Sequence, residues 1–154
     1  GGQEKGLRPG TLNTPLIVGL GTAMHLAQAE TKSARAHVTE CVARLRGALE
    51  GAIEGMVLNG HPHTRLPNTL SASIPGVEPL ALIRMLREDV AFSASSACST
   101  TSVRTSHVLL AMFGESDRAR TAFRMSPGRF TTLEEIDRVA AATVEAVRRL
   151  QRMM

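Results

Sequence analysis

Aromatic side chains are scarce in this 154-residue sequence, which has four Phe and neither Trp nor Tyr. Platforms on which bases or sugars stack are therefore largely absent. Basic residues outnumber acidic ones by 18 to 14, but they are spread along the chain, and only Lys5 and Lys32 are lysines. This distribution is typical of a solvated surface, so direct nucleic-acid binding is not expected.

Cysteine is equally rare, and its two copies, Cys41 and Cys98, lie far apart. The sequence shows no signal peptide and no long apolar run, which argues against a secreted domain held by disulfides and against a membrane span. We therefore predict a protein of the reducing cytoplasm. A metal site is not expected either, because His61 and His63 lie in a Gly/Pro-rich turn with no third ligand nearby.

The two cysteines differ in their surroundings. Cys41 shares one helical face with Val38, Val42 and Leu45, which predicts a buried core residue. Cys98 lies in the run SSACSTTS at 95–102, whose small hydroxylated side chains offer little to bury. That composition predicts a solvent-reachable loop, the setting in which reactive thiols occur. Cys98 is therefore the candidate nucleophile.

Alternating helical and strand patterns predict an α/β fold, and 43% hydrophobic residues suffice for one core. The first predicted helix begins at Asn13 or Thr14. Further helices are predicted at about 33–53, 79–86, 106–113 and 132–152. Short runs bounded by turn residues predict strands at 56–58, 69–74, 90–92 and 122–126. The last helix is the clearest, since Thr132 and Glu135 form a capping-box pattern.

Four motifs, found in this order along the chain, resemble those of a known enzyme family. They are GGQEKGLRPGT at 1–11, PLIVGLG at 15–21, the Ser-Ala-Cys stretch with SHVL at 106–109, and RMSPGRFTT at 124–132 with EEID at 134–137. Together they cover almost the whole chain. The sequence resembles the C-terminal portion of pyridoxal-phosphate-dependent cysteine desulfurases, in the class V aminotransferase-like family. It looks most similar to the group with a long, mobile cysteine loop, which serves iron–sulfur cluster assembly and thiolation.

This resemblance implies the C-terminal small domain of a fold type I pyridoxal-phosphate enzyme, with a small mixed sheet and helices on one face. Residues 1–31 are expected to form an arm and helix that belong to, or bridge from, a cofactor domain, and residues 32–154 the small α/β domain. Lys5 and Lys32 match no Schiff-base position. We therefore expect a longer chain to bind most of the pyridoxal 5'-phosphate elsewhere, and these 154 residues to be inactive alone. An exposed apolar face is expected where the rest would pack.

The reaction that the resemblance implies converts L-cysteine to L-alanine and leaves a persulfide on a protein thiolate. The resemblance assigns that thiolate to Cys98. Arg104 and His107 are the nearest groups in sequence that can favour its ionisation, and whether His107 has a catalytic role stays open.

The resemblance also assigns two binding residues. Arg124 matches the arginine that binds the substrate carboxylate, a task for which a rigid forked cation is suited. The residues alone favour a different role, an arginine at a strand end that pairs with a surface acid. Thr11 matches a residue whose hydroxyl reaches the cofactor phosphate across the interface of a homodimer, and its alternative role is the N-cap of the following helix.

The expected partners are L-cysteine, a second copy of the longer chain and a sulfur-acceptor protein, such as an iron–sulfur scaffold or a thiolation protein. Two alternatives stay open: a non-enzymatic domain that relays a persulfide, and a relative that acts on selenocysteine or cysteine sulfinate. The sequence does not name the acceptor, which in this family serves iron–sulfur assembly, transfer-RNA thiolation or DNA phosphorothioation.

Overall fold

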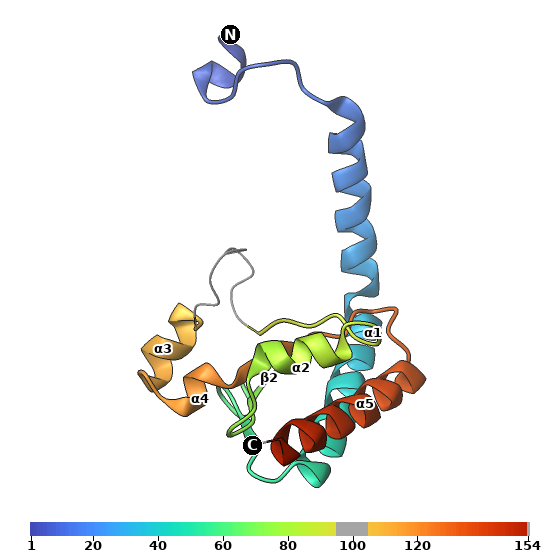
Figure 1. Cartoon of the computed structure of the whole chain (residues 1–154). Coiled ribbons are helices and arrows are strands. Elements are labelled where there is room, and N and C mark those ends of the chain that lie inside the picture. The colour runs from blue at the N-terminus through green and yellow to red at the C-terminus, as the bar shows by residue number, and fades with distance from the viewer. Residues whose placement is uncertain (95–104, 154) are drawn as a thin grey trace. The chain divides into compact units, whose positions relative to one another are not determined.

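The computed structural model describes residues 1–94 and 105–153 (Figure 1). In chain order its elements are η1 (Gln3–Gly6), α1 (Thr14–Ala52), β1 (Val57–Leu58), β2 (Leu70–Ser73), α2 (Pro79–Leu86), α3 (His107–Phe113), α4 (Asp117–Arg120), β3 (Ala122–Met125) and α5 (Leu133–Arg152). The α/β class is confirmed. The chain forms two compact units, Gly1–Ala34 and Arg35–Met154.

The first unit exposes its side chains throughout residues 1–33. Its helix begins as the sequence predicts: the Oδ1 of Asn13 accepts from the Leu16 N–H at 3.2 Å, and Pro15 occupies the first turn, where a missing N–H costs nothing. Exposed apolar side chains are present here, and the large ones are Leu7, Leu12, Leu16, Ile17, Val18, Leu20, Met24 and Leu26.

One helix, α1, replaces the two that the sequence predicted on either side of Lys32. The polar residues there do not break it, because their hydroxyls bond back to the preceding turn. Thr31 Oγ1 donates to Ala27 O at 2.5 Å, and Ser33 Oγ donates to Glu30 O at 3.0 Å. The prediction of two separate helices in this part of the chain was therefore wrong.

The sheet of the second unit has the order β1-β2-β3, and both pairs of neighbours are antiparallel. The prediction of a mixed sheet was therefore wrong for the described strands. The strand predicted at 90–92 does not form. Instead, the next residue, Ser93, makes an isolated antiparallel bridge to Arg124. Between each pair of neighbouring strands the described chain reverses its direction, which gives the antiparallel ladders.

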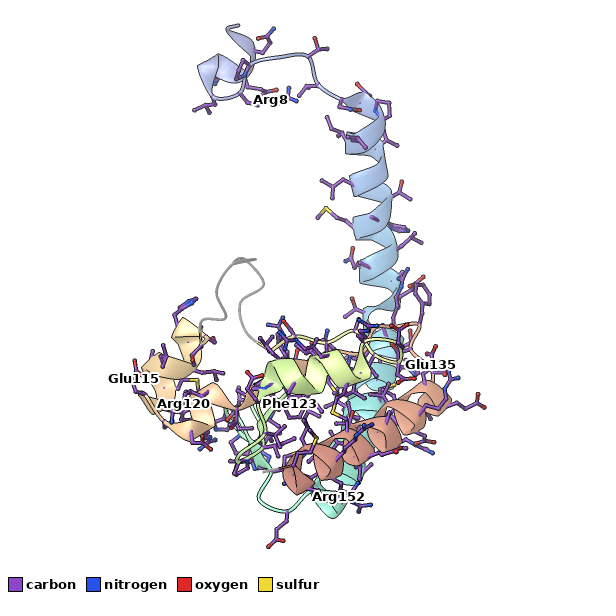
Figure 2. The ribbon with its side chains drawn as sticks, viewed as in Figure 1. Arg8, Glu115, Arg120, Phe123, Glu135 and Arg152 are labelled. Atoms are coloured by element: carbon purple, nitrogen blue, oxygen red, sulfur yellow. The ribbon has the colours of Figure 1, made fainter. Side chains whose placement is uncertain are left out.

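One face of this sheet belongs to the hydrophobic core. Alternate residues of β2 and β3 are buried there, with Phe123 of β3 marked in Figure 2. Phe92 meets Phe123 edge to face, with ring centroids 6.2 Å apart. Helices α1, α2 and α5 also contribute side chains to the core cluster. Its largest fully buried members are Phe123, Leu45, Leu49, Leu70, Ile74, Leu82, Val77 and Val147.

Two sets of side-chain hydrogen bonds stabilise the N-terminal part of α5. The predicted capping box is confirmed: Thr132 Oγ1 accepts from Glu135 N at 3.1 Å, and Glu135 Oε2 accepts from Thr132 N at 2.8 Å. One turn later, Asp137 accepts two hydrogen bonds of 2.6 Å from Arg44 of α1. The Arg44 guanidinium lowers the pKa of the Asp137 carboxyl, so this contact favours the folded chain above acidic pH.

The other face of the sheet is polar and carries a hydrogen-bond network centred on Arg118 of α4. Its guanidinium donates to Leu58 O at 2.9 Å and to Asn59 Oδ1 at 3.0 Å, and lies 3.9 Å from the centre of the Phe113 ring. Asn59 Nδ2 donates to Ser73 Oγ, which in turn donates to Arg118 O at 2.7 Å. This network fastens α3 and α4 to the sheet, so the described helices do not all cover one face.

We expect Arg118→Met to destabilise the full-length chain by about 2 kcal/mol, because it leaves Leu58 O and Asn59 Oδ1 without donors and removes the contact with Phe113. Chemical denaturation measures the loss. Arg120→Met is the matched control: Arg120 is exposed, and among the described residues its side chain bonds only Glu115 O, at 3.3 Å. Equal losses in the two variants would contradict this account of the network.

Candidate functional site

Arg124 projects from the polar face of β3 into a cavity of about 340 Å³. Three serines and a histidine share this cavity, which we call the Arg124 cavity, and they come from β2, the bridge beside β3 and the start of α3. They are Ser71, Ser93, Ser106 and His107. Apolar side chains of α3 and β3 complete the walls. The arrangement provides hydroxyl and guanidinium donors around a space the size of a small metabolite.

The Arg124 guanidinium has no acidic partner among the described residues. The ion pairs found there join Arg44 to Asp137, Arg46 to Glu50 and Arg87 to Glu88. The alternative of a strand-end arginine paired with a surface acid is therefore wrong for this part of the chain. A guanidinium with free donors in a polar cavity is suited to a forked hydrogen bond with a carboxylate.

Backbone hydrogen bonds fix the position of Arg124. Its N–H donates to Ser93 O at 2.7 Å and its carbonyl accepts from Ser93 N at 3.1 Å, while Ser71 pairs with it from the other side. Phe123 and Met125, its neighbours in β3, are buried in the core. The core therefore anchors the strand, and the alternation along β3 directs Arg124 to the polar face.

Cys98 lies outside the described residues. The described chain on its N-terminal side ends at Ala94, which lines the Arg124 cavity, and on its C-terminal side Ser106 and His107 line the same cavity. Both flanks of the candidate nucleophile therefore meet the candidate carboxylate site.

Thr11 lies in the first unit, in the loop before α1, and its hydroxyl has no partner among the described residues. The alternative role as an N-cap is wrong, because Asn13 caps the helix. Arg8, marked in Figure 2, donates to Gly10 O at 2.8 Å and to Thr11 O at 3.2 Å. Gly10 has a φ of 94°, which favours glycine.

The chemistry of this loop fits one contact with a phosphate group. The exposed Thr11 hydroxyl is a donor, the Arg8 cation lies within the same turn, and a side chain added at Gly10 would meet nothing within 4 Å. Lys5 belongs to η1 and Lys32 to α1. The structure brings Arg124 together with His107, whereas Thr11 belongs to the other unit.

Cys41 is buried, as predicted, and belongs to the core cluster. Its Sγ lies 3.6 Å from His37 Nε2 and 3.7 Å from Thr131 O, and His37 Nε2 lies 2.7 Å from the same carbonyl. Burial raises the pKa of the Cys41 thiol, so it stays protonated near neutral pH. The sequence analysis did not single out His37, although its spacing of four residues from Cys41 places both on one helical face.

We therefore expect Cys41 to resist alkylation. Iodoacetamide added to the folded full-length chain near neutral pH should label Cys98 at least about tenfold faster than Cys41, because a buried, protonated thiol reacts slowly. Peptide mapping by mass spectrometry gives the two rates, and the same reaction in denaturant is the control, where the difference should disappear. Equal labelling of both cysteines in the folded chain would contradict the assignment of Cys41 to the core.

Among the described residues, no set of three or more His, Cys, Asp or Glu side chains is gathered in a way that would hold a metal ion. None of the helices in the described ranges combines the length and the apolar character needed to cross a membrane.

Comparison with known proteins gives the class of this chain. Residues 2–139 match the family Aminotransferase class-V, so the chain belongs to that family. It is 40% identical over 153 residues to the mitosomal cysteine desulfurase of Encephalitozoon cuniculi and 42% identical over 153 residues to the cysteine desulfurase IscS of Anaeromyxobacter sp. (strain Fw109-5). Both matches include 99% of this chain but only 35% and 38% of the relatives. The chain therefore spans little more than a third of their length.

The fold comparison agrees. A solved structure described as a NifS-like protein superposes with a TM-score of 0.81 at 33% identity, over 96% of this chain and 37% of that one. The NifS-like protein from Rickettsia africae gives a TM-score of 0.77 at 25% identity, over 99% of this chain and 38% of that one. The predicted resemblance to the C-terminal portion of cysteine desulfurases is confirmed.

Proposed function

We propose that this chain is the C-terminal part of a cysteine desulfurase, which converts L-cysteine to L-alanine and carries the sulfur on Cys98 as a persulfide. The observation that carries this proposal is the Arg124 guanidinium, which has no acidic partner among the described residues, in a cavity bordered by both described flanks of Cys98. The relatives named cysteine desulfurase support it.

Arg124 binds the substrate carboxylate through a forked pair of hydrogen bonds. Because β3 is held between Ser71 and Ser93 and anchored in the core, the arginine is positioned before substrate arrives. Such preorganisation places the substrate sulfur within reach of an attacking group.

Pyridoxal 5'-phosphate is the proposed cofactor, and when bound it supplies an electron sink that weakens the bond between the substrate's Cβ and sulfur. Within this chain, Thr11 holds the cofactor phosphate through its hydroxyl. We place the lysine that anchors the cofactor in another part of a longer chain, so the 154 residues are inactive alone. The Thr11 loop serves the cofactor site of a partner subunit in a homodimer.

Cys98 accepts the sulfur. Its thiolate forms an S–S bond with the substrate sulfur while the Cβ–S bond breaks, and the released carbon takes up a proton to become the methyl group of alanine. His107 lines the Arg124 cavity and is the described titratable group placed to hold a proton there. The persulfide then passes to a sulfur-acceptor protein, in iron–sulfur cluster assembly or thiolation, within the reducing cytoplasm.

Turnover by the full-length chain tests this function. With L-cysteine, cofactor and a reducing thiol, it should release L-alanine and sulfide in equal amounts, because each turnover breaks one C–S bond. Amino-acid analysis and a sulfide assay measure the two products. Alanine without sulfide, or neither product, would contradict the proposal.

A further inference from the structure

The sheet register places a second donor beside Arg124. Ser71 of β2 is the direct cross-strand partner of Arg124, and direct partners in an antiparallel pair present their side chains on the same face. The flanking residues support this placement, because Leu70 and Ala72 of β2 are fully buried in the core, on the opposite face. Ser71 therefore shares the polar face with Arg124.

The backbone bonds show how close the two side chains lie. Arg124 exchanges both of its backbone hydrogen bonds with Ser93, and Ser71 O accepts instead from Asn59 N at 2.8 Å. Ser71 and Arg124 thus form a pair without backbone hydrogen bonds between them. Such pairs have Cα atoms about 4.5 Å apart, and their side chains approach more closely than those of hydrogen-bonded pairs.

Neither side chain is engaged elsewhere in the described chain. Ser71 is partly exposed, lines the Arg124 cavity, and its hydroxyl meets no partner among the described residues. Ser73, two residues along the same face, is by contrast buried and bonded within the Arg118 network. Ser71 is therefore an available donor beside an available guanidinium.

We propose that Ser71 is a second ligand of the substrate carboxylate, whose hydroxyl donates to a carboxylate oxygen that Arg124 also binds. A carboxylate has about four acceptor positions, so a forked arginine leaves room for a flanking donor. The inference rests on the proposed function, because it takes L-cysteine as the substrate. It adds a basis for substrate specificity: Ser71 and Arg124 together favour substrates that carry a free carboxylate over amines that lack one.

The test uses the full-length chain with its cofactor and measures the concentration of ligand that gives half of the change in cofactor absorbance. Ser71→Ala should raise this concentration about tenfold for L-cysteine, because it removes a hydrogen bond to a charged group. It should leave the value for cysteamine, which lacks the carboxyl group, unchanged. Ser71→Thr keeps the hydroxyl and should behave like the unmodified chain. Ser33→Ala, at an exposed position of α1 in the other unit, is the control.

A double substitution sharpens the test. If both residues bind one carboxylate, Ser71→Ala should have a much smaller effect in a chain that already carries Arg124→Ala. An unchanged value for L-cysteine in Ser71→Ala, or equal losses for L-cysteine and cysteamine, would overturn the proposal. An unmodified chain that binds L-cysteine but releases no sulfur would instead overturn the proposed function and leave the carboxylate site standing.

Discussion

Cys98→Ser in the full-length chain should abolish sulfur release while L-cysteine still binds. A serine hydroxyl does not ionise near neutral pH and is a far poorer nucleophile than a thiolate, so turnover should fall on the order of 10³-fold or more. Binding should persist because Arg124 belongs to β3 and does not depend on the thiol. Sulfide release and the change in cofactor absorbance on addition of L-cysteine measure the two properties separately.

Cys41→Ser is the matched control for this substitution. Cys41 is buried against His37 and Thr131, away from solvent, so its replacement should leave the rate of sulfur release nearly unchanged. Near-normal turnover in Cys98→Ser, or a comparable loss in Cys41→Ser, would show that the nucleophile has been assigned to the wrong residue.

Arg124→Ala should weaken L-cysteine binding about a hundredfold while the chain keeps its cofactor. Removing the cation leaves the substrate carboxylate without its main partner, a loss typical of a broken charged contact. Arg124→Lys should recover only part of the affinity, because an ammonium group cannot form the forked pair. Titration with L-cysteine, followed by cofactor absorbance, gives the affinities.

Arg120→Ala is the control for the removal of a positive charge. Arg120 lies on α4, marked in Figure 2, and bonds Glu115 O rather than lining the Arg124 cavity. Its substitution should leave L-cysteine binding within about twofold of the unmodified chain, as expected for an exposed charge outside the site. If Arg124→Ala loses the cofactor while its affinity for L-cysteine is unchanged, Arg124 is structural and the assignment is wrong.

The sequence predicted those features that depend on interactions between residues close together in the chain. The α5 start was predictable because Thr132 and Glu135 cap each other within one turn. The burial of Cys41 followed from the helical spacing of its apolar neighbours. Strands β2 and β3 were located to within a residue or two, because short runs bounded by turn residues leave few alternatives.

Features that depend on distant contacts were not predictable in this way. The direction of the strands depends on how the chain returns to the sheet. The continuity of α1 was missed for another reason: the hydroxyls of Thr31 and Ser33 bond to the preceding turn, and these residue types also favour breaks between helices. The pairing of Ser71 with Arg124 is a matter of register between segments more than 50 residues apart, which no single-sequence pattern encodes. The roles of Arg124 and Thr11 came from the family resemblance.

The most direct measurement locates the transferred sulfur. The full-length chain with its cofactor is treated with L-cysteine, alkylated under conditions that preserve persulfides, digested, and analysed by mass spectrometry. The account predicts one additional sulfur atom on the peptide that contains Cys98 and none on the peptide that contains Cys41. Alanine formed while the additional sulfur appears on Cys41, or on neither peptide, would contradict it.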